Sequence, residues 1–513
     1  MNRTFYVVFF KRNVDRRLQD LRLANLRMNL SANISSFFYK HRSLSTRQHC
    51  VLFSTTNSYF NVLEKPLSKH RHKKVQRIDG GSWEERLADV VTPLWRMSYE
   101  EQLDLKQKQQ ENILRQLSGY LLEDFQPHAS SHLRNKLNFP VLPILPSPHK
   151  DGYRNKSTFS VNRGIDGNPK TVGFYVGTGK KGNIVCVNGD HLLNMPEKHK
   201  LVARCYQDFI RLSPLEPCLL FHTGGHWREI TVRTNRQGHT MAIVYFHPQT
   251  LSPAEVALHK ADLVDYFTRG PGSVCQLDSL FFQESTMTRT THEESPYQLL
   301  HGQPHIYEEV LGFKFRISAD AFFQVNQVAA EVLYSAVRDL CVPQHSVQEK
   351  RTKVGTLLDV CCGTGAIGIT TSPRVDRVIG IELVEQAVED AKHNAALNDV
   401  PNCDFIPGKA EVVLPGLMSQ FGSGGPVAAV VNPSRAGLHH KVVRALRNQP
   451  DIRRLVFVSC KPDGEAMRNF RELCCAPDWQ KKLIGEAFSP SLALPVDMFP
   501  HTAHCELVLL FER

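Results

Sequence analysis

Several features that define common protein classes are missing from the 513-residue sequence. No apolar run approaches the roughly 18 residues that a membrane-spanning helix requires, so we predict no membrane span. The 13 cysteines contain no C-x-x-C pair and no regular short spacing, which argues against disulfide frameworks, zinc ribbons and iron–sulfur clusters. We therefore expect a chain without a metal or iron–sulfur cofactor that works in a reducing compartment.

Acidic residues are scarce at the N-terminus. Residues 1–78 hold 16 Lys and Arg but only three Asp and Glu, whereas the rest of the chain holds 46 and 48. Any nucleic-acid site on the body of the protein must therefore be a local patch. Residues 1–50 are Arg-rich, Ser-containing and acid-poor, which is typical of a mitochondrial transit peptide and predicts a location in the mitochondrial matrix. The alternative is a basic arm that stays on the protein and binds nucleic acid.

A linker and a helical segment precede the two predicted domains. Residues 51–85 are basic and read as the linker, and residues 86–126 form the helical segment. Within the segment, Ser98 and Glu101 match a capping box for a helix that runs to about Leu122. Polar residues dominate the first half of this helix, so we expect one solvated face.

The rest of the chain predicts two domains of different texture. Residues 127–311 alternate short β-type runs with turns, which predicts an α+β domain. In this domain Ile230–Thr234 and Met241–Phe246 flank the turn Asn235–Gly238 and predict a hairpin. Over residues 312–513 apolar strands alternate with helices, which predicts a doubly wound, Rossmann-like α/β domain. Its expected strands are Thr356–Val360, Val378–Ile381, Val427–Val431, Leu455–Val458 and Glu506–Phe511. The last of these strands can form an antiparallel edge.

A glycine-rich turn follows the first of these strands, in the sequence D-V-C-C-G-T-G-A-I-G that begins at Asp359. Gly363, Gly365 and Gly368 match the dinucleotide fingerprint, and Glu382 lies about 20 residues further on, so nicotinamide binding is one interpretation. The acid four positions before the first glycine instead follows the D-x-x-x-G-x-G pattern of S-adenosylmethionine binders. In both interpretations the glycines let a cofactor approach the backbone, and the later acid accepts ribose hydroxyls. A structural tight turn is the third possibility.

Two further motifs follow apolar strands and therefore lie at carboxyl ends, where ligands bind in such folds. Asn432 begins the sequence N-P-S-R-A-G, and its amide offers a donor and an acceptor to a cofactor or base, or else forms a simple turn. Cys460, in S-C-K-P, is a candidate nucleophile with a neighbouring Lys461. A buried and inert cysteine is the alternative.

The sequence D-M-F-P-H-T-A-H-C-E ends at Glu506. His501, His504 and Glu506 invite a metal interpretation, but their spacing is wrong for an H-E-x-x-H site and no further ligand is evident. We therefore predict no metal site here. A single carboxylate that acts as a general base fits this motif better.

In this order the four motifs resemble those of the RNA uracil-5 methyltransferase family. Phe322–Asn326 (F-F-Q-V-N) and Gly152–Lys156 (G-Y-R-N-K) are similar to two further elements of that family. Thr92–Trp95, followed by a Glu- and Gln-rich helix, resembles its vertebrate branch. The resemblance covers about residues 86–513. It implies a class I S-adenosylmethionine-dependent methyltransferase fold and an enzyme that methylates carbon 5 of uridine.

The resemblance also implies roles for individual residues. The thiolate and the proton acceptor of the family match Cys460 and Glu506. A thiolate that adds to carbon 6 of uracil makes carbon 5 nucleophilic toward a sulfonium methyl group, and the carbon-5 proton must then leave. The positions that match the family's cofactor contacts are Gln324, Cys361, Gly363, Glu382 and Asn432.

The expected partner is RNA from the mitochondrion. The family includes branches that act on the T-loop uridine of tRNA, which we favour, and branches that act on ribosomal RNA. A target uridine has to be flipped out of a loop into the pocket. Residues 127–311 are the expected RNA-binding domain, in which Arg154 and Lys156 are candidate phosphate contacts.

Two motifs depart from the family's pattern. Asn432 and Ser434 stand where the family has D-P-P-R, and Lys461 replaces the Asn of S-C-N-P. Lys461 would either help to hold Cys460 as a thiolate or contact RNA. Because the nucleophile and base positions are intact, we expect an active enzyme. The alternative is a non-catalytic RNA-binding or RNA-folding protein on a decayed methyltransferase fold.

Overall fold

The computed structural model describes residues 81–125, 137–177, 184–219, 224–286, 294–343, 354–418 and 426–513. The predicted transit peptide and most of the predicted linker lie outside these residues. Helix α3 (Trp83–Val91) begins within the linker range, because Ser82 and Glu85 form a capping box. Helix α4 (Tyr99–Phe125) begins at the predicted box, where the Glu101 amide donates to Ser98 Oγ at 3.3 Å.

The central domain is built on a seven-stranded sheet with the order β3-β2-β1-β4-β5-β6-β7. Its strands are β1 (Lys156–Asn162), β2 (Thr171–Val176), β3 (Val185–Val187), β4 (Trp227–Thr234), β5 (Thr240–Phe246), β6 (Ser279–Glu284) and β7 (Gln298–Gly302). The predicted hairpin is confirmed as β4 and β5, which pair antiparallel. Helices α6 (Glu197–Leu212) and α7 (Pro253–Thr268) contribute Tyr206 and Leu263 to a core with Ile230 and Phe246.

The C-terminal domain contains the predicted doubly wound sheet, with the order β12-β11-β10-β13-β14-β16-β15. Its strands are β10 (Thr356–Val360), β11 (Arg377–Glu382), β12 (Cys403–Pro407), β13 (Val427–Val431), β14 (Ile452–Ser459), β15 (Ser489–Val496) and β16 (Glu506–Glu512). Strands β10 to β14 run parallel, and β16 runs antiparallel to β14. The continuous apolar runs of these strands are buried because both faces of the sheet are covered.

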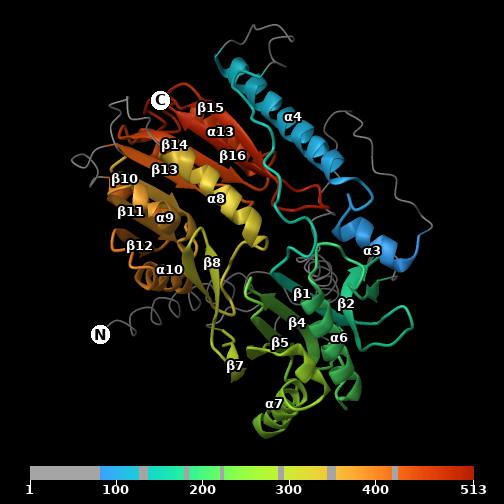
Figure 1. Ribbon diagram of the computed structural model, residues 1–513. Helices are drawn as coiled ribbons and strands as arrows, with labels where there is room; N and C mark the ends of the chain where they lie inside the picture. The colour runs from blue at the N-terminus through green and yellow to red at the C-terminus, as the bar shows by residue number, and fades with distance from the viewer. Residues whose placement is uncertain are drawn as a thin grey trace, which may run out of the picture. The chain divides into compact units, whose positions relative to one another are not determined.

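Helices cover the two faces of this sheet (Figure 1). On one face, Leu357 of β10 packs in a core with α8 (Gln327–Cys341), α9 (Ala366–Thr371) and α10 (Glu385–Leu397). On the other face, the next residue, Leu358, packs in a core with α4, α11 (Ala410–Met418), α12 (His440–Asn448) and α13 (Glu465–Cys474). The alternation follows from the two-residue period of a strand. Helix α4 thus belongs to the packing of the C-terminal sheet.

The expected antiparallel edge strand is an interior strand, because β16 lies between β14 and β15. Strand β15 was not predicted, since it contains Pro490 and Pro495, and proline is confined to the edges of sheets. Residues 137–148 lie along the outer edge of β15, where the Leu142 backbone N–H donates to Ala493 O at 2.9 Å. This proline-spaced segment, which we assigned to the central domain, therefore lies on the sheet of the C-terminal domain.

The domain boundary that we placed between residues 311 and 312 falls inside a β-hairpin. Strands β8 (Ile306–Val310) and β9 (Phe313–Ile317) pair antiparallel across a two-residue turn at Leu311 and Gly312, both with positive φ. The apolar side chains of both strands pack in the same core as α8 and α10. The whole hairpin therefore belongs with the C-terminal domain.

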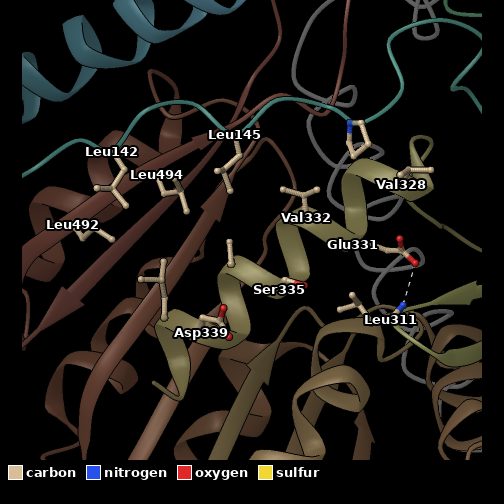
Figure 2. A pocket seen from close by; sticks show the side chains of 13 residues that line it. Leu142, Leu145, Leu311, Val328, Glu331, Val332, Ser335, Asp339, Leu492 and Leu494 are labelled. Atoms are coloured by element: carbon tan, nitrogen blue, oxygen red, sulfur yellow. Dashed lines mark hydrogen bonds between the residues drawn. The ribbon is translucent and has the colours of Figure 1, made fainter. Parts of the chain in front are cut away.

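A groove lies between α8, β15 and the segment that carries Leu142 and Leu145 (Figure 2). Its lining is mainly apolar, with Glu331 and Asp339 as its carboxylates. None of the predicted site residues lines it, so the candidate chemistry lies elsewhere. Within the described ranges, no helix is long and apolar enough to cross a membrane. In the same ranges, no cluster of His, Cys, Asp or Glu is placed to hold a metal ion.

Candidate active site

The topology of the C-terminal sheet gathers the predicted residues at one edge. Because β10, β11, β13 and β14 are parallel, the residues that end or follow them meet at their carboxyl ends. These residues are Gly363, Glu382, Asn432 and Cys460. Strand β16 runs the opposite way and begins at the same edge with Glu506. The register pairs Ser459 with Leu507, which brings Cys460 and Glu506 together although 45 residues separate them in the sequence.

Cys460 and Glu506 influence each other's ionisation. Glu506 is only 5% exposed, and burial raises the pKa of its carboxyl to about 7. Burial also raises the pKa of the Cys460 thiol, and the negative charge of Glu506 raises it further. Both groups therefore hold their protons more tightly than they would in water.

Arg435 opposes both effects. It hydrogen-bonds to Cys460, and its positive charge lowers the pKa of that thiol and of Glu506. We expected that Lys461 could help to hold Cys460 as a thiolate. The contacts do not support this role, because Lys461 is exposed and Arg435 is the cation beside the thiol. Arg435 was missing from the predicted site residues. Its place in the N-P-S-R motif, after a buried strand, was the signal that could have identified it.

The glycine turn after β10 has the form of a cofactor cradle. Gly363 and Gly365 have φ values of 55° and 81°, in the left-handed region that glycine adopts most readily. A Cβ atom at Gly363 would meet no atom within 4 Å, so open space lies before the turn. The Gly363 amide donates to one carboxylate oxygen of Glu382 at 3.0 Å, which anchors this acid beside the turn. A turn whose backbone a ligand can approach closely, beside a carboxylate that accepts hydrogen bonds, suits a nucleoside cofactor.

Two more predicted cofactor contacts flank this turn. Asn432 is half-buried at the end of β13, where its backbone N–H donates to Val360 O at 3.2 Å. Cys361 packs with its side chain against the core on the α11–α13 face, and burial raises the pKa of its thiol to about 12. Cys361 is therefore a neutral, partly buried thiol at the pH of the cell.

The two predicted elements upstream lie against each other. Asn155 donates through its amide group to Gln324 O and through its backbone N–H to Val325 O, both at 2.8 Å. Arg154 forms an isolated bridge with Asn326. Asn326 in turn donates to Met498 O at 3.1 Å, in the loop that leads to Glu506. The central domain, the F-F-Q-V-N element and the loop that precedes Glu506 are thus connected by direct hydrogen bonds.

The two predicted phosphate contacts are both half-buried. Burial and the nearby Arg233 guanidinium lower the pKa of Lys156 to about 7. At neutral pH Lys156 therefore carries less positive charge than an exposed lysine does.

The sheet order, the helices on both faces and the glycine turn define a class I methyltransferase domain. A methyltransferase-domain profile matches residues 357–447, which span the turn, Glu382 and Asn432. The crystal structure of a Pyrococcus abyssi tRNA (uracil-54, C5)-methyltransferase with S-adenosyl-L-homocysteine is similar to this chain, with a TM-score of 0.57 and 22% identity. The match covers 82% of this chain and 86% of that one, and shows a shared fold. The protein is therefore a methyltransferase with S-adenosylmethionine as its cofactor, and the nicotinamide interpretation is set aside.

Sequence relatives narrow this class to one family. The chain is 68% identical to tRNA (uracil-5-)-methyltransferase homolog B of Danio rerio over 432 residues, 84% of this chain and 88% of the relative. It is 57% identical to homolog B of Homo sapiens over 435 residues, 84% of this chain and 85% of the relative. Homolog A of Homo sapiens is 42% identical over 441 residues, 83% of this chain and 68% of that protein. The chain belongs to the tRNA (uracil-5-)-methyltransferase family.

Proposed function

We propose that this protein methylates carbon 5 of a uridine in mitochondrial tRNA, with Cys460 as the nucleophile and Glu506 as the proton acceptor. The observation that carries the proposal is the register of β14 and β16, which sets this thiol and this carboxylate side by side. Covalent catalysis at uracil needs one group that adds to carbon 6 and another that removes the proton from carbon 5. The names of the relatives support tRNA as the substrate.

The proposed reaction can be written with every bond and proton accounted for. Cys460 loses its proton to solvent, and its thiolate sulfur adds to carbon 6 while the C5=C6 electron pair moves to form an enolate. S-adenosylmethionine supplies an electrophilic methyl group when it is bound. Carbon 5 then forms its bond to this methyl group as the bond between the methyl group and the sulfonium sulfur breaks, and S-adenosylhomocysteine is the leaving group. Glu506 removes the carbon-5 proton, the C5=C6 bond forms again, and the C6–S bond breaks to return the thiolate of Cys460.

Arg435 is suited to assist at two points of this sequence. Its hydrogen bond to Cys460 favours the thiolate over the thiol, which assists both addition and departure of sulfur. Its charge also keeps the pKa of Glu506 from rising above about 7. A base of this strength accepts a proton and releases it again near neutral pH.

For the cofactor we propose contacts with Gln324, Cys361, Gly363, Glu382 and Asn432. The anchored carboxylate of Glu382 can accept hydrogen bonds from ribose hydroxyls, and Asn432 can both donate and accept. The open space before Gly363 supports the assignment of the turn.

Replacement of Gly363 tests the cofactor assignment. In Gly363→Ala the new methyl group enters the open space before the turn, so we expect S-adenosylmethionine to bind at least about tenfold more weakly in calorimetric titration. Gly312→Ala is the matched control, because Gly312 also has a positive φ and open space but lies in the β8–β9 turn. Both variants should lose similar thermal stability. Equal affinities in the two variants would contradict the assignment.

The ionisation of Glu506 predicts a pH dependence for the release step. Only the carboxylate can accept the carbon-5 proton, and the pKa of Glu506 is raised by burial to about 7. The decay rate of the covalent enzyme–RNA adduct should therefore rise about tenfold per pH unit below this pKa and level off above it. Rapid-quench single-turnover experiments measure this rate. A rate that does not change between about pH 5.5 and 8 would show that Glu506 is not the base.

The proposed mitochondrial location rests on the basic composition of the N-terminus, and the proposed RNA contacts rest on cationic residues of the central domain. The composition of residues 1–50 supports import into the mitochondrial matrix. Arg154 and Lys156 adjoin the F-F-Q-V-N element, so contacts of these side chains with phosphates would lie beside the proposed cofactor contact Gln324. A loop uridine is favoured because the base must leave its stack to reach Cys460.

Methyl transfer to unmodified RNA tests the proposed function. The purified protein is incubated with labelled S-adenosylmethionine and with separate transcripts of mitochondrial tRNA and of mitochondrial ribosomal RNA, and the products are digested to nucleosides. We expect label in 5-methyluridine from tRNA. Label in ribosomal RNA alone would replace the proposed substrate. RNA binding without label in either transcript would favour the non-catalytic alternative.

A further inference from the structure

The loop that joins β15 to β16 places Glu506, and its conformation depends on contacts from outside the sheet. The loop spans residues 497–505 and begins with Asp497, which is fully buried. His501, within the loop, has a φ of 65°, in the left-handed region that is unfavourable for a residue with a side chain. A loop held in such a conformation needs restraint from its surroundings.

The strongest restraint is a buried ion pair with helix α4. Lys106 Nζ donates to Asp497 Oδ1 at 2.6 Å, and both side chains have 0% exposure. The same ammonium group donates to Phe499 O at 3.0 Å. Tyr99 lies about two turns before Lys106 on α4. Its hydroxyl donates to Asp497 Oδ2 at 3.0 Å and accepts a hydrogen bond from the Ser147 backbone N–H at 2.8 Å. One cation thus fixes both a side chain and a main-chain group of the loop.

Gln102 of the same helix holds the next part of the loop. Its side-chain oxygen accepts the His501 amide at 2.7 Å, and its side-chain NH₂ donates to Leu94 O and Met97 O. The ring of His501 is held on its far side by Asp151 at 2.7 Å. Tyr153 donates to Pro500 O at 3.0 Å. The main chain from residue 499 to residue 501 is therefore held by α4 and by the start of the central domain.

This arrangement is costly if stability is its only purpose. A buried ion pair loses the hydration of both charges, and well-packed apolar residues of the same size often stabilise a protein equally well. A polar network that fixes the conformation of one loop has value where a reacting group must be held to a fraction of an ångström. In the proposed reaction Glu506 is such a group, and it directly follows the loop.

We propose that Lys106 is a positioning residue for the proton-abstraction step, acting through Asp497 and Phe499 on the loop that places Glu506. The inference rests on the proposed function. In the step concerned, the C5–H bond breaks, Glu506 takes the proton, the C5=C6 bond forms again and the thiolate of Cys460 leaves carbon 6. Helix α4 thus contributes to the chemistry of the C-terminal domain through a side chain that is fully buried.

The test measures how long the covalent enzyme–RNA adduct lasts. Lys106→Met removes the ammonium group and keeps the length of the side chain. In single-turnover experiments with an unmodified tRNA transcript, quenched samples on denaturing gels should show normal adduct formation and decay that is slower by up to about a hundredfold. Lys108→Met is the matched control, because Lys108 lies on the same helix, is 73% exposed and pairs with the exposed Asp104. Its adduct should decay at the wild-type rate.

A second variant separates positioning from stability. Lys106→Met leaves Asp497 as a buried charge without its partner, which destabilises the fold. The double variant Lys106→Met with Asp497→Asn removes both charges, so its melting temperature should return toward that of the wild type. The lost bond from Lys106 to Phe499 O is not restored, and the adduct should still decay slowly.

Each outcome decides the proposal. Slow adduct decay in the stable double variant supports a positioning role for Lys106. If the single variant does not fold, the double variant alone decides the test. Wild-type decay in the double variant, or in a folded Lys106→Met protein, overturns it. Wild-type protein that forms neither an adduct nor 5-methyluridine would instead refute the proposed function itself.

Discussion

Cys460→Ala is expected to abolish methyl transfer, with a fall in rate of about 10⁶-fold, the size of loss seen when another covalent enzyme loses its nucleophile. Without the thiol, carbon 5 of uracil does not become an enolate carbon and has no reactivity toward the methyl group. The variant should bind S-adenosylmethionine with the affinity of the wild type, because the glycine turn and Glu382 are unchanged. Formation of labelled 5-methyluridine and calorimetric titration with the cofactor measure the two quantities.

Cys403→Ala is the control for this substitution. Cys403 is also a half-buried free cysteine of the C-terminal sheet, but it begins β12 and so lies at the opposite edge from the carboxyl ends of the parallel strands. Its replacement should leave methyl transfer at the wild-type rate. Substantial activity in Cys460→Ala would mean that a different residue attacks carbon 6 or that the reaction is not covalent.

Glu506→Gln is expected to block the reaction after methyl transfer and to trap the enzyme on its RNA. An amide cannot take the carbon-5 proton, so the adduct forms but decays slowly, and turnover should fall by about 10²- to 10⁴-fold. The substitution also removes the negative charge that raises the pKa of Cys460, so formation of the adduct should be no slower than in the wild type. A protein–RNA band that survives denaturing electrophoresis is the expected observation.

Glu308→Gln provides the control for a buried carboxylate. Burial raises the pKa of Glu308 to about 7, as for Glu506, but Glu308 lies in the β8–β9 hairpin. This variant should neither accumulate an adduct nor lose turnover. Rapid turnover in Glu506→Gln, with no accumulation of the adduct, would assign the base to another group.

The parts of the fold that could be predicted from the sequence are those in which local pattern and burial agree. Strands β10 and β13 are short apolar runs buried on both faces, and their observed limits match the predicted ones. Their parallel order then brings Gly363, Asn432 and Cys460 to one edge, as residues after such strands must be. In this part of the chain, sequence order and topology together determine the site.

The missed features depend on contacts between distant parts of the chain. Strand β15 was not predicted because its prolines fit only an edge position, which the sequence does not reveal. One face of the polar first half of α4 is solvated as expected, but the burial of Lys106 and Gln102 on its other face was not predicted. Their partners, Asp497 and His501, lie about 390 to 400 residues further along the chain, and no local pattern announces such a pairing.

Arg435 was missed as a site residue for the same reason. The motif placed it near the end of β13, but its effect on Cys460 and Glu506 depends on β14 and β16 being neighbours in the sheet. The parallel pairing of β13 with β14 and the antiparallel pairing of β14 with β16 together put a cation, a thiol and a carboxylate in one place.

The most direct test of covalent catalysis at carbon 6 is tandem mass spectrometry of the adduct trapped by Glu506→Gln. The adduct is formed with unmodified tRNA transcript and S-adenosylmethionine, and is then digested with protease and ribonuclease. We expect a single peptide that contains Cys460 and carries a nucleotide with one additional methyl group. A nucleotide attached to a different residue, or a trapped nucleotide without the added methyl group, would contradict the proposed order of steps.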